Sequence, residues 1–400
     1  TDTGSFLTGP YLMTPKTNGM VVVWELDKPM KSTITYGTSD ADKKTLEVPV
    51  EEGEKFKGES MHMYRARLTD LTPGTTYTYK VETEDGQTMD GHFRTLPENS
   101  DEIRFVVVSD SHRFETATKV SDVIAQFDPD FILHTGDMVE GTGSQKDQFP
   151  YWFQNVGSFL HNVPVIYNSG NHDYGVYFDE YVTKVQKEQY KSNKTGRNVA
   201  FDCGPVHFDM LDSNPWSLFE LNSTAGGGEA DAATKAVVNE SLDWLKADLA
   251  TDDAKKADFR VVTMHHPFED DLTRKYVPSI VENGNVNIMF SGHTHLYSRY
   301  ASADPKRGAD TLYVTQGDAR IGDGKIDTGK PDQRLNDNYP NLLATGKGDM
   351  LEVTVKDGLM TYKNLGLSSD GEKIFETVTL SKDGAKLAYS DISITPDTVQ

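Results

Sequence analysis

The chain contains very little cysteine, and its acidic residues far outnumber its basic ones. Its 400 residues include one cysteine, Cys203, so no disulfide can form within the chain. This excludes the disulfide-stabilised domains of many secreted eukaryotic proteins and leaves an exported bacterial enzyme or a cytosolic one. The 40 Lys and Arg residues against 62 Asp and Glu give a formal charge of −22. A chain without a cationic excess is poorly suited to polyanions, so we expect no nucleic acid as a stable partner.

Long apolar runs are also absent. No stretch approaches the roughly 20 apolar residues that a membrane-spanning helix needs, so we expect no membrane span. The chain begins with Thr1 and lacks an apolar signal-like segment there, which fits a processed protein. At 400 residues it exceeds the usual size of one hydrophobic core, so we expect two domains.

Residues 1–97 have the pattern of an all-β domain. Short β-rich runs at 20–24, 32–36, 64–68 and 77–81 are separated by clusters of Gly, Pro and Asp, as in a β-sandwich. Tyr77 opens one run just after a Thr-Pro-Gly turn, where its hydroxyl can bond back to upstream backbone. The segment resembles a fibronectin type III domain. Residues 98–101 are the predicted linker to a second domain.

Five polar segments in the second domain end in side chains that bind divalent metals. They are Asp110-Ser111-His112, Gly136-Asp137, Gly170-Asn171-His172-Asp173, His265-His266-Pro267 and Gly292-His293-Thr294-His295. Each follows a short apolar or β-branched run, typical of a strand buried on both faces of a sheet. The segments are therefore predicted at the C-terminal strand ends, where the loops of α/β folds form ligand sites. The three glycines fit sharp turns or close approach of the backbone to a ligand.

The types of ligand predict two metal ions rather than one. Imidazole, carboxylate and one carboxamide, with no thiolate, suit Fe, Zn or Mn better than a cysteine-rich structural zinc site does. The seven candidates are too many for one tetrahedral ion: Asp110, His112, Asp137, Asn171, His265, His293 and His295. Two divalent or trivalent ions about 3.5–4 Å apart, sharing one carboxylate, are a common arrangement for displacement at phosphorus. A small phosphorylated substrate is the partner that this chemistry predicts.

The order of these segments resembles the calcineurin-like metallophosphoesterases, whose signature reads D-x-H, G-D, G-N-H-[DE], H and G-H-x-H. The resemblance covers about residues 102–366 and implies an α/β fold, a four-layer α/β/β/α sandwich, with residues 367–400 as a C-terminal β extension. It also implies the ligands of each ion. One ion would be bound by Asp110, His112 and His295, the other by Asn171, His265 and His293, with Asp137 bridging them.

A sandwich domain ahead of the catalytic one gives the chain the layout of the purple acid phosphatases. Relatives with this layout are commonly exported, which favours a periplasmic or extracellular bacterial protein. The purple enzymes have D-x-G followed by G-D-x-x-Y, whose tyrosine binds iron and gives the colour. This chain has His112 at the glycine position and Glu140 at the tyrosine position. The resemblance therefore predicts no tyrosinate-to-iron absorption band and weakens the case for Fe(III) and for an acidic pH optimum.

The predicted reaction needs a nucleophile and a proton donor. Two cations acting on one water lower its pKa, hold the phosphoryl oxygens and offset the charge that develops in line, so a metal-bridging hydroxide is the expected nucleophile. The leaving alkoxide needs a proton, and His172 is the candidate general acid, with Asp173 beside it to orient or charge the ring. The family resemblance assigns the same role to this histidine. A buried histidine without a catalytic role is the alternative.

Two further residues are candidates for binding substrate. Arg113 follows the first motif and could grip a phosphate with its planar guanidinium, although exposed arginines usually form surface ion pairs. Neighbouring strand residues point to opposite faces, so only one of His265 and His266 is a ligand. The family's H-x-P pattern selects His265, which leaves His266 to reach a substrate oxygen or to fill space. His134, Asp212, Tyr297 and Arg299 are interpreted as structural, and His207 carries no usable pattern.

The sequence as a whole predicts a metal-dependent phosphate-ester hydrolase, with a phosphomonoesterase as the preferred reading. A phosphodiesterase or nucleotide hydrolase stays open, because the same metal pair accepts either ester. A catalytically silent binding or adhesion module is the alternative of another class, which the intact motifs disfavour. Three stretches interrupt the alternation of strands and helices and are predicted as loops that shape the pocket: 140–155, 174–199 and 213–239.

Overall fold

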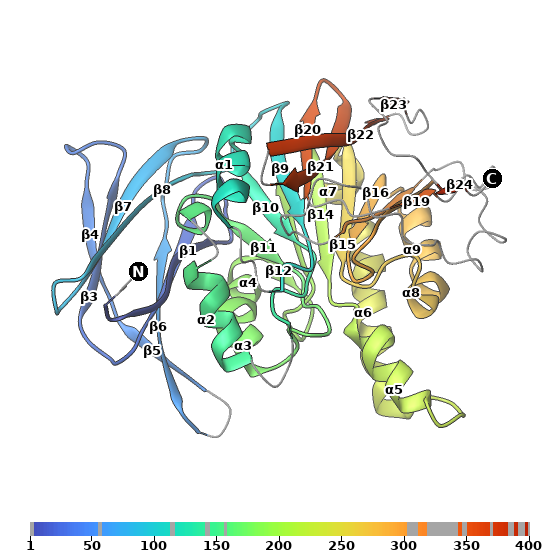
Figure 1. The fold of residues 1–400 in the computed structure, drawn as a ribbon, viewed down its shortest axis with the longest axis horizontal. Helices are drawn as coiled ribbons and strands as arrows, with labels where there is room; N and C mark the ends of the chain where they lie inside the picture. Colours follow the sequence, from blue (N-terminus) through green and yellow to red (C-terminus); the bar gives the residue numbers. More distant parts are fainter. Residues whose placement is uncertain are drawn as a thin grey trace.

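A computed structural model describes most of the chain as an all-β domain followed by an α/β domain (Figure 1). The described residues are 4–54, 58–112, 117–140, 145–155, 158–301, 311–317, 343–345, 350–368, 371–382, 388–390 and 397–398. Arg113, predicted to bind phosphate, lies outside them.

The N-terminal domain consists of two four-stranded antiparallel sheets. One contains β1 (Phe6–Met13), β2 (Met20–Leu26), β6 (Ser60–Leu68) and β5 (Val50–Glu54), and the other β4 (Lys44–Val48), β3 (Ser32–Gly37), β7 (Thr76–Thr83) and β8 (Thr88–Arg94), in these orders. Buried and exposed residues alternate strictly along β7, which makes it a strand with one solvated face. Trp24 and Tyr64 stack in the core with ring centroids 5.8 Å apart. The backbone N–H of Thr72 donates to the Tyr77 hydroxyl over 2.8 Å, the bond predicted for this tyrosine.

Two mixed sheets form the centre of the second domain. The seven-stranded sheet has the order β11 (Val165–Tyr167), β10 (Phe131–His134), β9 (Ile103–Val108), β20 (Met350–Lys356), β21 (Leu359–Ser368), β22 (Gly371–Ser381) and β23 (Ala388–Ser390). The nine-stranded sheet has the order β12 (Lys191–Ser192), β13 (Val199–Cys203), β14 (Val206–Leu211), β15 (Phe259–Met264), β16 (Ile288–Ser291), β18 (Leu312–Thr315), β17 (Tyr297–Ala301), β19 (Leu343–Thr345) and β24 (Asp397–Thr398). The strands of the predicted extension, β22 to β24, thus continue these same sheets.

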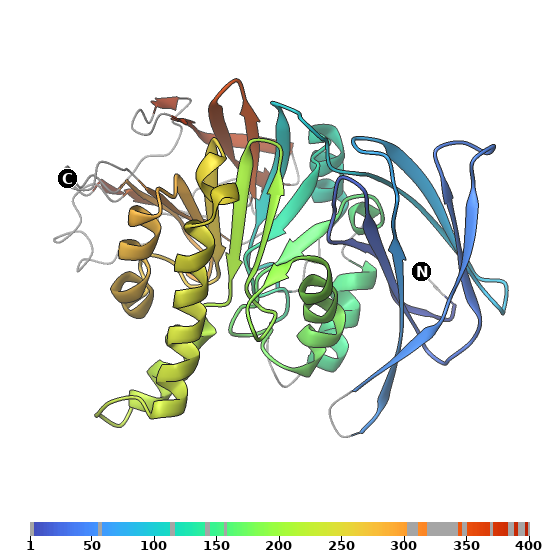
Figure 2. The same ribbon diagram turned by 180° about the vertical axis from the view of Figure 1, so that it is seen from behind.

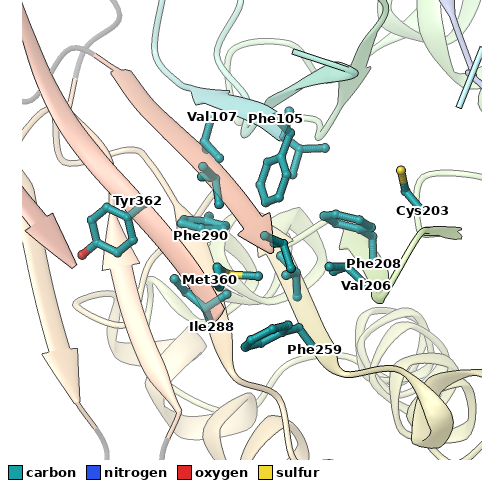
Figure 3. Close-up of a cluster of buried hydrophobic side chains, with 14 of the residues drawn as sticks. Phe105, Val107, Cys203, Val206, Phe208, Phe259, Ile288, Phe290, Met360 and Tyr362 are labelled. Atoms are coloured by element: carbon teal, nitrogen blue, oxygen red, sulfur yellow. The ribbon is translucent and has the colours of Figure 1, made fainter. Parts of the chain in front are cut away.

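The apolar core lies between the two sheets. Phe105 and Val107 from the first sheet face Phe208, Phe259 and Phe290 from the second (Figure 3). The sole cysteine, Cys203, is buried at the margin of this cluster and carries a free thiol. Strands of this kind are apolar on both faces, because helices cover the outer face of each sheet.

Helices complete the four layers that the sequence predicted (Figure 2). On the seven-stranded sheet lie α1 (Ala117–Phe127) and α2 (Gln145–Asn155). On the nine-stranded sheet lie α6 (Ala232–Leu249), α8 (Asp271–Tyr276) and α9 (Pro278–Asn283). No helix among the described residues is long and apolar enough to cross a membrane.

The three stretches predicted as loops are largely helical, so that prediction was wrong. Residues 140–155 include α2, and 174–199 include α3 (Val176–Phe178), η3 (Asp179–Thr183) and α4 (Lys184–Gln189). Residues 213–239 contain η4 (Pro215–Glu220), α5 (Leu221–Thr224) and the start of α6. These helices are short or wound as π-helix, so they give no 3.6-residue periodicity long enough to recognise.

The two domains share a buried ion pair. The Arg65 guanidinium on β6 donates to the backbone oxygen of Glu180 over 2.7 Å and to its carboxylate over 3.3 Å. Only 2% of the Arg65 side chain and 5% of the Glu180 side chain are exposed. Removing one partner of a buried pair leaves the other charge desolvated and poorly compensated.

Arg65→Ala should therefore lower the free energy of unfolding by about 3 kcal/mol in a urea titration followed by circular dichroism. Arg67 is the matched control, because its side chain is 35% exposed and its partners Glu51 and Glu188 are 32% and 42% exposed. Arg67→Ala should lower the free energy of unfolding by less than about 1 kcal/mol. Equal losses for the two variants would contradict a special role for the buried pair.

Candidate metal centre

The seven predicted ligands all lie just beyond the C-terminal ends of five strands. Asp110 and His112 follow β9, Asp137 follows β10 and Asn171 follows β11. From the other sheet, His265 follows β15, and His293 and His295 follow β16. Strands β9 to β11 run parallel, as do β14 to β16, so the carboxyl ends of each set meet at one edge. The structure thus brings together residues up to 185 positions apart.

The first group of side chains contains Asp110, His112 and His295. The Nε2 atoms of the two histidines are 3.2 Å apart, and Asp110 Oδ1 lies 3.3 Å from His295 Nε2. Ligands that share a tetrahedral ion at bond lengths of about 2.0–2.2 Å lie about 3.3–3.6 Å from one another. Asp110 Oδ1 is buried and accepts no well-aligned hydrogen bond from the described residues. This spacing fits three ligands of one cation.

The second group contains Asp137, His265 and His293. His265 Nε2 is 3.1 Å from both Asp137 Oδ2 and Asn171 Oδ1. Its other nitrogen, Nδ1, donates to the backbone oxygen of Thr135 over 2.9 Å. That hydrogen bond fixes the tautomer whose Nε2 lone pair faces the carboxylate and carboxamide, as metal-binding histidines require.

The electrostatics of the centre favour positive charge. Burial opposes an imidazolium at His265, yet the carboxylates of Asp137 and Asp110 raise the pKa of this histidine to about 10. Burial alone would raise the pKa of Asp110, but His265, His295 and Ser109 hold it below its usual value. Both carboxylates are thus ionised in a water-poor site, and cations are the partners that offset their charge.

The backbone is strained at five of the seven candidates. Positive φ angles occur at Asp110 (49°), His112 (47°), Asp137 (59°), His293 (77°) and His295 (60°). Such conformations cost about 1–3 kcal/mol each for residues other than glycine and persist where the surrounding structure enforces them. Strain of this kind clusters at active sites and ligand clamps, and here it turns the side chains toward one another.

Two of the predicted glycines allow these loops to approach closely. A Cβ at Gly170 would overlap the side chain of Asp137, and a Cβ at Gly292 would overlap Ser109. Only glycine leaves room for the carboxylate at the first position and for the serine hydroxyl at the second. That serine donates to Asp110 Oδ2 over 2.6 Å.

His172 lies between the two groups. Its ring centroid is 5.5 Å from that of His112, and its Nε2 is 3.9 Å from Asp137 Oδ2. The side chain is 37% exposed, so it is accessible to solvent. Its backbone N–H donates to Asp137 Oδ1 over 3.0 Å, which fixes the loop. His172 can therefore meet a ligand that approaches from solvent.

Asp173 occupies a different position from the one predicted. Its fully buried carboxylate accepts backbone hydrogen bonds from Asp137 at 2.6 Å, Gly170 at 2.9 Å and Val139 at 3.3 Å. It holds together two of the loops that carry candidate ligands, because a carboxylate this buried needs the backbone donors. Burial, and then the charge of Asp137, raise the pKa of Asp173 to about 7.

Two roles were predicted for His266, contact with a substrate oxygen or filling space, and its position in the structure favours the second. It is 2% exposed, and its ring centroid lies 4.6 Å from that of His293. Its Nδ1 pairs with Ser213 Oγ over 2.6 Å, and the same oxygen accepts the His266 backbone N–H over 3.0 Å. A side chain enclosed in this way supports the His293 ligand and has no surface for a substrate oxygen.

Three supporting residues were not recognised from the sequence as part of the site. Burial lowers the pKa of His134 to about 3, so its ring is neutral. The Gly136 N–H donates to its Nδ1, so its Nε2–H donates to Ser111 Oγ over 2.9 Å and joins two ligand loops. Thr135 contributes its backbone oxygen, and Ser213 contributes a hydrogen bond to His266, 53 positions further along the chain. Neither residue belongs to a recognisable sequence motif.

Each of the two domains matches a known protein family. Residues 103–297 match the family described as calcineurin-like phosphoesterase, and residues 11–95 match the N-terminal domain of purple acid phosphatases. Purple acid phosphatase 15 of Arabidopsis thaliana is 24% identical over 280 residues, which cover 59% of this chain and 49% of that protein. Purple acid phosphatase 22 of the same plant is 25% identical over 347 residues, 80% of this chain and 72% of that protein. The chain thus spans about half the length of the first of these relatives and nearly three quarters of the second.

Solved structures show the same fold. The purple acid phosphatase PPD1 from yellow lupin seeds superposes with a TM-score of 0.66 at 17% identity, covering 93% of this chain and 74% of that one. The structure of PhoD gives a TM-score of 0.68 at 13% identity, covering 99% and 94%. Both superpositions cover the all-β domain and the α/β domain of this chain.

Proposed function

Since this chain joins a purple acid phosphatase-type N-terminal domain to a calcineurin-like phosphoesterase domain, we propose that it is a binuclear metal-dependent phosphomonoesterase. The observation that carries the proposal is the pair of ligand groups, in each of which the candidate atoms lie within 4.8 Å of one another. Asp110, His112 and His295 would hold one ion. Asn171, His265 and His293 would hold the other, and Asp137 would bridge them. Iron, zinc and manganese all suit this donor set.

The residues around the metals have different roles in the proposed reaction. Two bound cations supply an activated water at neutral pH and offset negative charge on the phosphoryl group. Asp110 and Asp137 keep the site anionic enough to retain cations, and the Thr135 carbonyl keeps His265 in the ligand tautomer. His172, exposed between the two groups, protonates the oxygen of the leaving group.

Comparison of two chromogenic substrates tests the choice of monoester. The proposed enzyme should cleave an aryl phosphate monoester faster than the matching bis-aryl diester, with kcat/KM as the readout on one metal-loaded sample. The names of the plant relatives, which are phosphatases, support the monoester. A dominant diester rate would instead establish the phosphodiesterase or nucleotide hydrolase reading.

Metal analysis separates an enzyme from a silent binding module. Chelation should abolish turnover, and addition of Mn²⁺, Zn²⁺ or Fe²⁺ should restore it together with two ions at the centre. A chain that binds fewer than two ions there and stays inactive after all three additions would be a binding or adhesion module.

Iron-loaded protein should lack the purple colour of the enzymes it resembles. Glu140 stands at the position where those enzymes have the tyrosine that binds iron. We expect no tyrosinate-to-iron absorption band in the visible spectrum of protein whose Fe(III) content has been confirmed by elemental analysis. A band at full iron occupancy would show that another tyrosine reaches the metal.

The compartment and the class of the first domain complete the proposal. We place the protein in the periplasm or outside the cell and assign residues 1–97 to the fibronectin type III type. The Tyr77 hydroxyl bond to Thr72 supports that class. Fractionation of the producing cells tests the compartment, and recovery of the protein only in the cytosol would contradict it.

A further inference from the structure

A second cluster of metal-binding side chains lies between α6 and the nine-stranded sheet. His207 and Asp209 are two residues apart on β14, so both side chains point to the same face of the sheet. Asp248, near the end of α6, approaches them from the helix. Figure 2 shows α6, in yellow-green, alongside these strands. We call His207, Asp209 and Asp248 the α6 cluster.

The α6 cluster is separate from the metal centre. His207 follows the first residue of β14, whereas the chain just beyond the other end of that strand reaches the centre through Ser213 and His266. All three members are buried, with exposures of 3% for His207, 0% for Asp209 and 2% for Asp248. Nothing in the proposed reaction uses them.

The cluster gathers three candidate ligands for a cation, which lie at the contact distances of a hydrogen-bonded network. His207 Nε2 lies 2.7 Å from Asp248 Oδ2 and 3.2 Å from Asp209 Oδ2, and the three ligand atoms all fall within 4.8 Å of one another. The second ring nitrogen, Nδ1, is 2.8 Å from Asp202 Oδ1. A carboxylate on the far nitrogen is the usual support of a metal-binding histidine, since it orients the ring and makes it more basic.

The Asp209 side chain gives independent evidence that the cluster binds an ion. Its side chain is fully buried, and apart from the 3.2 Å contact with His207 Nε2, neither oxygen accepts a well-aligned hydrogen bond from the described residues. A buried carboxylate without such donors is costly, so native proteins pair it or place it on a metal. With both Asp209 oxygens available, the cluster offers four donor atoms.

The net charge of the cluster also favours the binding of a divalent ion. Three carboxylates, from Asp202, Asp209 and Asp248, face one ammonium group, that of Lys191, which pairs with Asp248 Oδ1. With His207 neutral and Asp209 ionised, as metal ligands must be, the cluster would carry two uncompensated negative charges.

We propose that His207, Asp209 and Asp248 bind a third ion, a structural divalent transition metal such as Zn²⁺, which fastens α6 to β14. One imidazole with carboxylate oxygens is a donor set that zinc accepts. The ion replaces a proton-mediated contact between helix and sheet with direct bonds to both elements. Its role is to hold the helix layer in place, and it takes no part in ester hydrolysis.

Anomalous diffraction at the zinc edge tests the proposal on unmodified protein. Crystals equilibrated with ZnCl₂ should show a peak about 2.0–2.1 Å from His207 Nε2, in addition to peaks at the metal centre. Peaks at the centre without one at His207 would overturn the proposal and leave an imidazolium among carboxylates. A peak at His207 without any at the centre would support this site while refuting the proposed function.

Zinc content in solution gives a second test through matched variants. After dialysis from excess Zn²⁺, wild-type protein should retain three ions per chain, and Asp209→Asn and Asp248→Asn should each retain two. Asp243→Asn is the control, since it removes an exposed carboxylate from the same helix and should leave three ions. Asp202→Asn should weaken zinc binding at the third site about 10–100-fold, as loss of a supporting carboxylate does. Three ions in Asp209→Asn, or two in the wild type, would contradict the assignment.

Discussion

Asp137→Ala should lose bound metal and activity together. Asp137 Oδ2 lies 3.1 Å from His265 Nε2, and its Oδ1 accepts the His172 backbone N–H over 3.0 Å. The substitution thus removes a ligand and loosens the loop that carries the proposed acid. Because loss of a supporting residue alone costs about 10–100-fold in metal affinity or activity, loss of the proposed bridge should reduce kcat/KM by more than about 100-fold.

The measurement pairs elemental analysis with kinetics on one preparation. Asp137→Ala should bind fewer than two ions at the centre, while its circular dichroism spectrum stays that of the folded protein. Asp137→Asn keeps the shape and an oxygen for the His172 N–H but lacks the charge, so it should also lose metal. Asp122→Ala removes an exposed carboxylate from α1 and is the control. Full metal content in Asp137→Ala would show that Asp137 is not the bridge.

The strands and the ligand loops could be predicted because each carries its own local signal. A run such as Phe105 to Val108 is apolar on both faces, and a covered parallel sheet is what stabilises such a run. The polar residues that follow therefore fall at one edge of the sheet. Choosing the seven candidate ligands needed only their types and order, since the chain connectivity of the fold brings them together.

The supporting contacts could not be predicted, because they depend on atoms that no motif records. Asp173 sits beside His172 in sequence, yet its carboxylate is oriented by three backbone N–H groups of the surrounding loops. His265 is held by the Thr135 carbonyl, which any residue type supplies. His266 is enclosed by Ser213, 53 positions away in the chain.

The α6 cluster was missed for a related reason. His207 and Asp209 are spaced as same-face residues of a strand, but that spacing alone describes many exposed strands. Asp248 lies 41 positions beyond His207 and reaches it only because α6 packs on β14. Burial of all three side chains, which distinguishes a cation site from a solvated surface, is a property of the folded protein.

His172→Ala should keep both metals and lose turnover in proportion to how poor the leaving group is. An alkoxide needs a proton as the ester bond breaks, and general acids contribute typically about 10²–10⁴-fold to such steps. We expect kcat on an alkyl phosphate to fall by about that factor. The nitrophenolate released from a nitrophenyl phosphate is a stable anion that needs no proton, so kcat on this substrate should fall by less than about 10-fold.

Metal content separates this effect from damage to the centre. His172 Nε2 is 3.9 Å from the nearest carboxylate oxygen of Asp137 and is assigned no metal, so elemental analysis should still find two ions at the centre. His92→Ala is the matched control, because it removes an exposed histidine from β8 in the other domain. It should leave both substrates unaffected. Equal losses on the alkyl and nitrophenyl substrates in His172→Ala, at full metal content, would point to substrate positioning instead of proton transfer, because only a general acid makes the loss depend on the leaving group.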